Sequence, residues 1–141
     1  MESPVPLMIE RLKTLTELKK VAGMVTIEAM LQQALPSPSC FVYHTVDHVL
    51  ELLDSQRVVE LVDTVWAASV VFKNVKITDD IMPDEAEIIN KKIIELLTGW
   101  IPFNEGFPLI YRGSKPLFEQ NRLIRVNLFS LKQVLEMEYR E

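Results

Sequence analysis

The chain has 141 residues, of which 48% are hydrophobic and 25% charged, and its formal net charge is −5. This length suits one domain over residues 1–141, and the apolar content is too high for a disordered chain. The acidic balance argues against a protein that binds nucleic acid by wrapping it in basic charge, although it permits one that DNA merely passes.

The terminal residues and the cysteine content indicate a protein of a reducing compartment. Cys40 is the single cysteine, so no intrachain disulfide forms. The first residues, Met1–Pro4, contain an acid and no basic segment. No apolar run approaches about 18 residues, and we therefore expect neither a signal peptide nor a membrane span.

The first third of the chain predicts mainly helix. Apolar residues at helical spacing favour a helix over residues 3–20, although residues 18–22 could instead form a short strand closed by Gly23. Thr26 is a suitable N-cap for a second helix through Ala34. The proline and serine residues at 36–39 end that helix.

The middle of the chain predicts two strands with an ambiguous segment between them. Residues 40–44 are β-branched and aromatic after a proline turn, which is typical of a strand. Residues 45–56 could form a short helix or a long loop with buried anchors. Residues 57–75 are apolar at both parities, which indicates a central strand covered on both faces.

A helix is predicted over residues 83–98. Pro83 suits its first position, acidic residues follow in the first turn, and Gly99 with a later proline ends it. Trp100 is expected to line the core at this corner. The residues expected in the core itself are Trp66, Phe72, Ile89, Ile93 and Leu96.

The last third predicts strands. Residues 109–111 and 117–118 are expected to be short strands around a turn at Gly113–Ser114, and residues 123–135 alternate as a long strand. Long adjacent strands combined with a few helices predict an α+β fold, in which helices pack on one face of a mixed or antiparallel sheet.

The residue patterns point to no catalytic, metal or cofactor site. His44 and His48 have the i, i+4 spacing of metal ligands, but no glutamate lies between them and a strand–loop boundary is expected to separate them. Cys40 lies about 13 Å along a strand from His44, too far for a thiol–imidazole hydrogen bond. The acidic residues at 79–87 lack the glycine and spacing of a calcium loop.

Basic residues concentrate in the last third of the chain, after the acidic segment at 79–87. Such polarity is common in subunits that stack or close into rings, because opposite patches meet on neighbouring copies. A scattered, solvated surface is the alternative interpretation. The basic residues are Arg112, Lys115, Arg122, Arg125 and Arg140.

The order of segments resembles the tail terminator proteins of tailed bacteriophages, a group of phage minor tail proteins. An amphipathic helix and a Val-Ala-Gly turn precede a Pro-Ser-Cys-Phe-Val strand. The most specific parts are the strand ending Val-Phe-Lys-Asn at 71–74, the Gly-Trp-x-Pro corner at 99–102 and the Arg-Gly pair at 112–113. The resemblance spans roughly residues 9–138.

The resemblance implies a non-enzymatic virion protein of the tail and neck, assembled in the host cytoplasm. Such proteins form a ring, usually of six subunits, on the last ring of the tail tube. The ring stops tube polymerisation and meets neck or head-completion proteins, and in contractile tails it also meets the sheath. Six copies at −5 each give −30, which suits a lumen through which DNA slides without specific binding.

Interface residues are expected in the polar loops and the basic third, because irregular segments on rigid elements often carry contacts. We expect contacts in the loops 74–83 and 104–107 and salt bridges from the basic residues to neighbouring subunits or the tube. The predicted interface residues are Lys73, Lys76, Asp79, Asp80, Phe103, Arg112, Lys115, Arg122 and Arg125.

Three other functions are compatible with the residues. The first is another head–tail connector, such as a stopper, which would bind the portal side. The second is a small metal-dependent enzyme that uses His44 and His48. The third is a cytosolic adaptor unrelated to phage. Binding to purified tail tubes separates a connector from a terminator. Metal analysis tests the enzyme, and the genome neighbourhood tests the adaptor.

Overall fold

The computed structural model describes residues 1–23, 36–54, 58–73, 84–119 and 121–137. Two helices and five strands follow one another as α1 (Val5–Leu12), β1 (Lys20–Gly23), β2 (Ser39–Asp54), β3 (Val58–Lys73), α3 (Asp84–Leu97), β4 (Ile110–Glu119) and β5 (Arg122–Met137). No helix in these ranges is long and apolar enough to cross a membrane.

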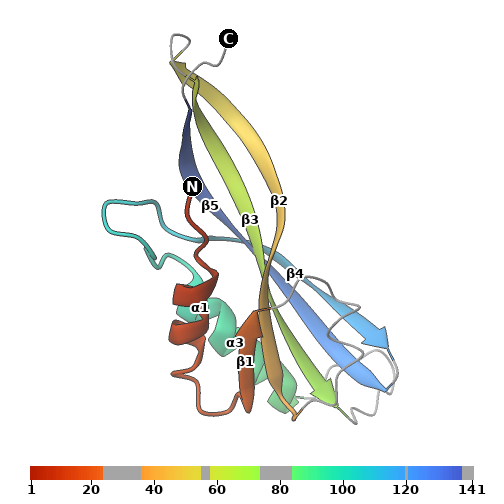
Figure 1. Ribbon diagram of the computed structural model, residues 1–141. Coiled ribbons are helices and arrows are strands. Elements are labelled where there is room, and N and C mark those ends of the chain that lie inside the picture. The colour runs from red at the N-terminus through yellow and green to blue at the C-terminus, as the bar shows by residue number, and fades with distance from the viewer. Residues whose placement is uncertain (24–35, 55–57, 74–83, 120, 138–141) are drawn as a thin grey trace.

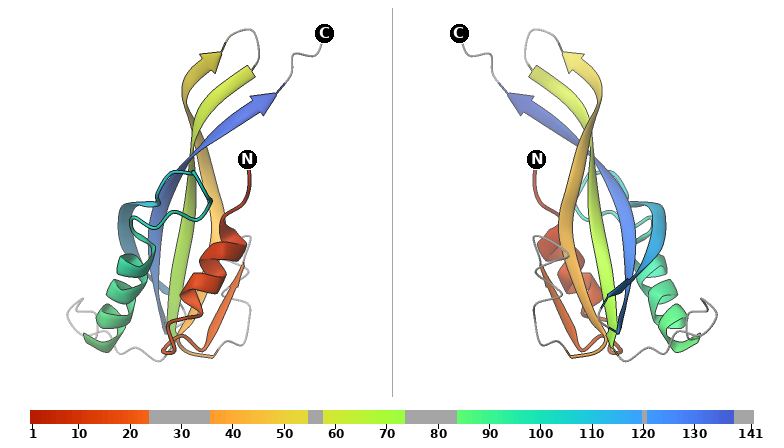
Figure 2. Two further views of the ribbon diagram at one scale, coloured as in Figure 1. Left: turned by 90° about the vertical axis from the view of Figure 1, so that its left-hand side faces the viewer. Right: turned by 90° about the vertical axis from the view of Figure 1, so that its right-hand side faces the viewer.

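The strands form one sheet in the order β1-β2-β3-β5-β4 (Figure 1). β1 pairs with β2 in parallel, and the other neighbours are antiparallel. Both helices cover the same face of the sheet (Figure 2). The predicted α+β fold, with a mixed sheet and helices on one face, is therefore confirmed.

The main core lies between the helices and the sheet, where α1 and α3 bury the apolar stripes that their helical spacing creates. Trp66, Phe72, Ile89 and Ile93 are buried there, as predicted. Leu96 and Trp100 are only partly buried at its border. A smaller cluster covers the opposite face of the sheet and comprises Phe41, Tyr43, Ala67, Val71, Ile124 and Val126.

The N-terminal helix is shorter than predicted. α1 ends at Leu12, and the chain then turns so that the backbone N–H of Lys19 donates to the carbonyl of Pro38 at 2.8 Å. This turn places β1 beside β2, so the alternative of a short strand closed by Gly23 is the correct one. The second predicted helix, residues 26–34, lies outside the described residues, as does the loop 74–83.

The segment 45–54 is neither a helix nor a loop with buried anchors, so that prediction was wrong. It continues β2, and its side chains from 45 to 53 are exposed. The pairing with β3 shifts register at three places, with Thr45, Leu50 and Leu53 as the extra residues. After each bulge, the following side chains lie on the opposite face of the sheet from the one that simple alternation predicts. Apolar and polar residues therefore do not alternate along this part of the sequence.

The predicted turn at Gly113–Ser114 is absent as well. β4 runs through these residues, and the pairing with β5 skips one residue, Arg112. Gly113 has a φ of 120°, a conformation that side-chain-bearing residues rarely adopt. The glycine therefore marks a β-bulge within one strand rather than a connection between two.

Cys40 is fully buried in β2. Burial raises the pKa of its thiol from 9.0 to about 12, because the apolar surroundings disfavour the thiolate.

Because the pKa of the Cys40 thiol is raised in the folded protein, the free energy of unfolding depends on pH in the alkaline range. The stabilising contribution is complete below the unfolded pKa of 9.0 and is lost as the pH rises towards about 12. Between these pH values, we therefore expect the unfolding free energy of the wild type to fall more steeply with pH than that of Cys40→Ala. The difference in slope corresponds to the release of up to one additional proton per molecule on unfolding. Urea unfolding at stepped pH measures both slopes, and equal slopes would contradict the assignment.

Candidate assembly interface

Several predicted basic residues meet at one end of the sheet. Lys73, the last residue of β3, pairs with Arg122, the first residue of β5. Lys115 of β4 pairs with Val126, which lies four residues after Arg122 on the same side of β5. Lys73, Lys115 and Arg122 therefore share the face away from the helices, and we call these three residues the basic end. Arg125 lies on the helix-covered face.

The other predicted interface residues do not join the basic end. Arg112 sits at the bulge in β4, where its Nε donates to Ser130 Oγ at 2.7 Å and one terminal nitrogen lies 3.6 Å from a carboxylate oxygen of Asp63. Phe103 belongs to the loop that follows α3. Lys76, Asp79 and Asp80 lie outside the described residues. The structure thus divides the predicted interface into separate regions.

The Gly-Trp-x-Pro corner is held by backbone hydrogen bonds. The Gly99 N–H donates to the Leu109 carbonyl at 2.8 Å, and the Leu109 N–H donates to the Trp100 carbonyl at 2.9 Å. Arg11 of α1 donates from Nε to the Leu96 carbonyl at 2.7 Å, with its guanidinium 4.9 Å from the Trp100 ring centre. The loop 100–109 is therefore closed at its base and fixed to α1.

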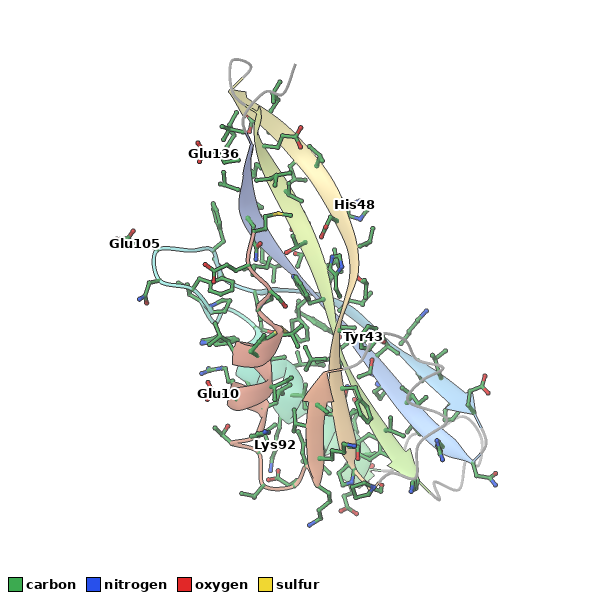
Figure 3. The ribbon with its side chains drawn as sticks, in the orientation of Figure 1. Glu10, Tyr43, His48, Lys92, Glu105 and Glu136 are labelled. Atoms are coloured by element: carbon green, nitrogen blue, oxygen red, sulfur yellow. The ribbon has the colours of Figure 1, made fainter. Side chains whose placement is uncertain are left out.

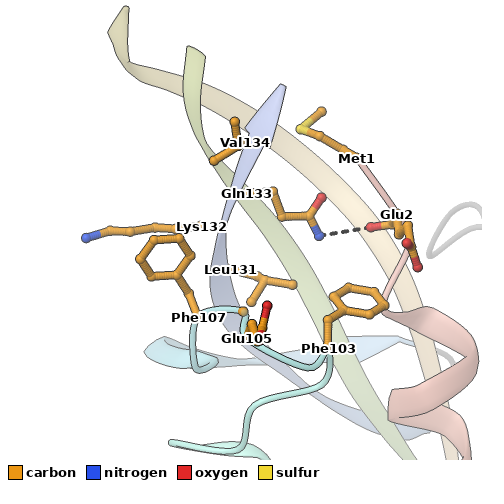
Figure 4. Close-up of a pocket in the computed structure, with 10 residues that line it drawn as sticks. Met1, Glu2, Phe103, Glu105, Phe107, Leu131, Lys132, Gln133 and Val134 are labelled. Carbon is orange, nitrogen blue, oxygen red and sulfur yellow. Dashed lines mark hydrogen bonds between the residues drawn. The ribbon is translucent and has the colours of Figure 1, made fainter. Parts of the chain in front are cut away.

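This loop forms one wall of a groove of about 350 Å³ (Figure 4). β5 supplies the floor, and the N-terminal residues supply the opposite wall. The lining is largely apolar but includes the charged side chains of a glutamate on each wall and a lysine of β5. The lining residues are Met1, Glu2, Phe103, Glu105, Gly106, Phe107 and the β5 residues 131–134.

Gln133 is the polar residue on the floor of the groove. Its side chain is 9% exposed, and its Nε2 donates to the Glu2 carbonyl at 2.9 Å (Figure 4). Its buried Oε1 has no hydrogen-bond partner among the described residues. A buried amide oxygen without a donor carries a desolvation cost.

A comparison with protein families identifies the chain. A model described as phage tail terminator protein matches residues 2–136. The chain belongs to the phage tail terminator family. The resemblance noted in the sequence is therefore confirmed, and the family is one of structural tail proteins rather than enzymes. A comparison with curated proteins gives no match.

The matched range contains the basic end, the groove and an exposed apolar segment that sequence reasoning missed. β2, β3 and β5 extend beyond the helices as a long twisted arm (Figure 1). On β2, this arm exposes Val46, Val49, Leu50, Leu52 and Leu53. Exposed apolar residues gathered on one strand mark an interaction surface. The absence of glycine and proline from 45 to 54 was the available sign of a continuing strand.

The two histidines are separated in this tail terminator. His44 pairs with Trp66 on β3, whereas His48 pairs with Asp63, three residues away, so the two imidazoles lie on opposite faces of the sheet. The His44 ring lies 4.6 Å from the Trp66 ring, and its Nε2 lies 2.7 Å from Asp47 Oδ1. His48 lies on the arm, away from the helices (Figure 3). The fold therefore does not bring these side chains to one metal ion.

Proposed function

We propose that this protein caps the phage tail tube as a ring, stops tube polymerisation and joins the tail to the neck or head, without catalysing a reaction. The observation that carries the proposal is the family match over residues 2–136. The ring would contain six copies, as the sequence resemblance implies. Its partners would be the tail tube protein, the neck or head-completion protein and, in contractile tails, the sheath.

The charge distribution supports this proposal. The basic end gathers three cations, with Glu119 of β4 paired beside Arg122, in a chain whose net charge is −5, so it offers a local cationic patch to an acidic partner. Lys73 and Arg122 occupy the extreme residues of adjacent paired strands, which fixes their backbones. The acidic balance of the whole chain disfavours tight retention of DNA in the lumen of the ring.

Tube assembly in the presence of the protein tests the function. Purified tail tube protein is polymerised with and without the chain, and tube lengths and end densities are measured by electron microscopy. We expect shorter tubes with extra density at one end when the chain is present. Unchanged lengths together with bare ends would contradict the proposal.

Charge reversal at the basic end is expected to weaken capping. In Lys73→Glu/Arg122→Glu, repulsion replaces attraction to an acidic partner, so about tenfold more protein is expected for the same capped fraction. Lys91→Glu is the control, because Lys91 is exposed on α3, away from the basic end. Equal capping by both variants would show that the basic end is not part of the interface. The function itself would then depend on the tube assay of the wild type.

A further inference from the structure

The arm has two unpaired sheet edges within the described part of the chain. β1 covers β2 only from Ser39 to Val42, so the outer side of β2 from 43 to 54 has no strand beside it there. β4 covers β5 only as far as Ser130, so the outer side of β5 from 131 to 135 has no strand beside it within the described residues. Both edges present backbone N–H and C=O groups that are free to pair with another strand.

The outer segment of β2 carries the charged residues Asp47 and Glu51 but also exposes large apolar side chains. Val49 is 64% exposed and Leu52 is 57% exposed. Natural edges usually carry charges or are covered, because an apolar edge strand recruits another chain. Between the bulges at Thr45 and Leu50, residues 46–49 form a regular stretch that keeps strand geometry for pairing.

The β5 edge is built to receive such a strand. It borders the groove, in which Phe103 and Phe107 of the loop wall lie near Lys132 and Val134 of β5. Charge is complementary as well: Glu51 pairs with Leu61 and Lys132 pairs with Asp63, two positions of the same parity on β3. Glu51 and Lys132 therefore occupy the same face of the sheet, at opposite edges of the arm.

We infer that the outer β2 segment of one copy adds as a strand to the β5 edge of a second copy of this chain, beside the loop that carries Phe103 and Phe107. This deepens the proposed function and rests on it for the ring. β2 and β5 both run antiparallel to β3, so they are parallel to each other. A rotation about an axis along the arm preserves strand direction, and the new pair is therefore parallel.

The arrangement uses both edges of every copy. The contact joins two different surfaces, and such head-to-tail contacts close into a ring when the rotation closes. A two-fold contact of β2 with β2 would instead leave each β5 edge and its groove unfilled. In the head-to-tail arrangement, Glu51 of one copy lies on the same face as Lys132 of the next copy. This opposite charge favours pairing of β2 with β5 over pairing of β2 with β2.

Cross-linking of mixed cysteine variants tests the arrangement. His48→Cys and Val134→Cys place one thiol at each edge on the same face, because their partners on β3, Asp63 and Leu61, share parity. Cys40 is buried and does not compete. With a short bismaleimide, we expect a product of twice the chain mass when the two variants are mixed, and none from either variant alone.

Other outcomes overturn the inference. A product from His48→Cys alone would show a two-fold β2 contact. The absence of a mixed product, both at high protein concentration and on tail tubes, would show that the edges do not meet. If the mixed product forms but the wild type neither binds nor shortens tubes, the contact stands and the capping function fails.

Surface variants supply a second test, read by light scattering and by cross-linking on tubes. Leu52→Lys is expected to weaken self-association by about tenfold or more, because a charge enters the apolar contact. Ile88→Lys on α3 is the matched control, since Ile88 is also 57% exposed. Lys132→Glu should weaken association, and Glu51→Lys added to it should restore association. The contact is contradicted if Leu52→Lys associates as strongly as the wild type, or if Glu51→Lys does not restore the association of Lys132→Glu.

Discussion

Replacing Phe129 with alanine is expected to lower the free energy of unfolding by about 3–5 kcal/mol, the largest stability effect that the fold predicts. Phe129 is fully buried in β5. It pairs with Trp66 on one side and Tyr111 on the other, and its ring centre lies 5.8 Å from that of Tyr111. The resulting cavity would open in the closely packed main core, which relaxes only partly to fill it.

Chemical denaturation followed by circular dichroism measures this loss. Phe118→Ala is the matched control, because it deletes the same atoms from β4 at a site that is 44% exposed. The control is expected to change stability by about 1 kcal/mol or less. Similar losses for both variants would contradict the burial of Phe129 in the main core.

Removing the amide of Asn127 is expected to cost about 2–3 kcal/mol. Asn127 and Asn90 are both fully buried between α3 and β5. The Nδ2 of Asn127 donates to Asn90 Oδ1 at 2.8 Å and to the Ala68 carbonyl at 3.1 Å. Asn127→Ala leaves both acceptors buried without this donor, and a buried acceptor without a donor costs more than the hydrogen bond itself contributed.

A double-mutant cycle measures the coupling between the two amides. Asn90→Leu and Asn127→Leu are each expected to destabilise the protein, while the double variant should recover much of the loss, since both polar groups are then removed together. Urea unfolding of the four proteins gives the interaction free energy. Additive losses would indicate that the two amides are not coupled in the folded protein.

Local sequence patterns predicted the regular elements where one face of an element is buried. The helix at 83–98 and the strands at 57–75 and 123–135 all match observed elements within a few residues. In the helix and in the strand at 123–135, apolar side chains repeat with the period of the structure because they bury against the main core, whereas the strand at 57–75 is apolar at both parities. The 45–56 prediction failed because three bulges break the period and the apolar residues there face outward.

The candidate interface was predicted at two places, where neighbouring strands end together and in the loop at Phe103 and 104–107, which lines the groove. Lys73 and Arg122 were expected contacts and are paired in the sheet. The groove was not predicted, because its lining comes from the N-terminal residues, the loop 103–107 and the β5 residues 131–134, which are far apart in sequence. Its polar residue, Gln133, gives no sign in the sequence that its amide oxygen is buried.

The α+β class, the family and most of the long elements could be predicted without the structure, because these depend on composition, on periodicity and on short motifs such as the Gly-Trp-x-Pro corner. The tertiary structure decided which surfaces are available for assembly. Strand pairing leaves one edge of β2 and one of β5 unpaired on the arm within the described residues, and the loop after α3 walls the groove beside β5. These features depend on contacts between distant segments, which no local pattern encodes.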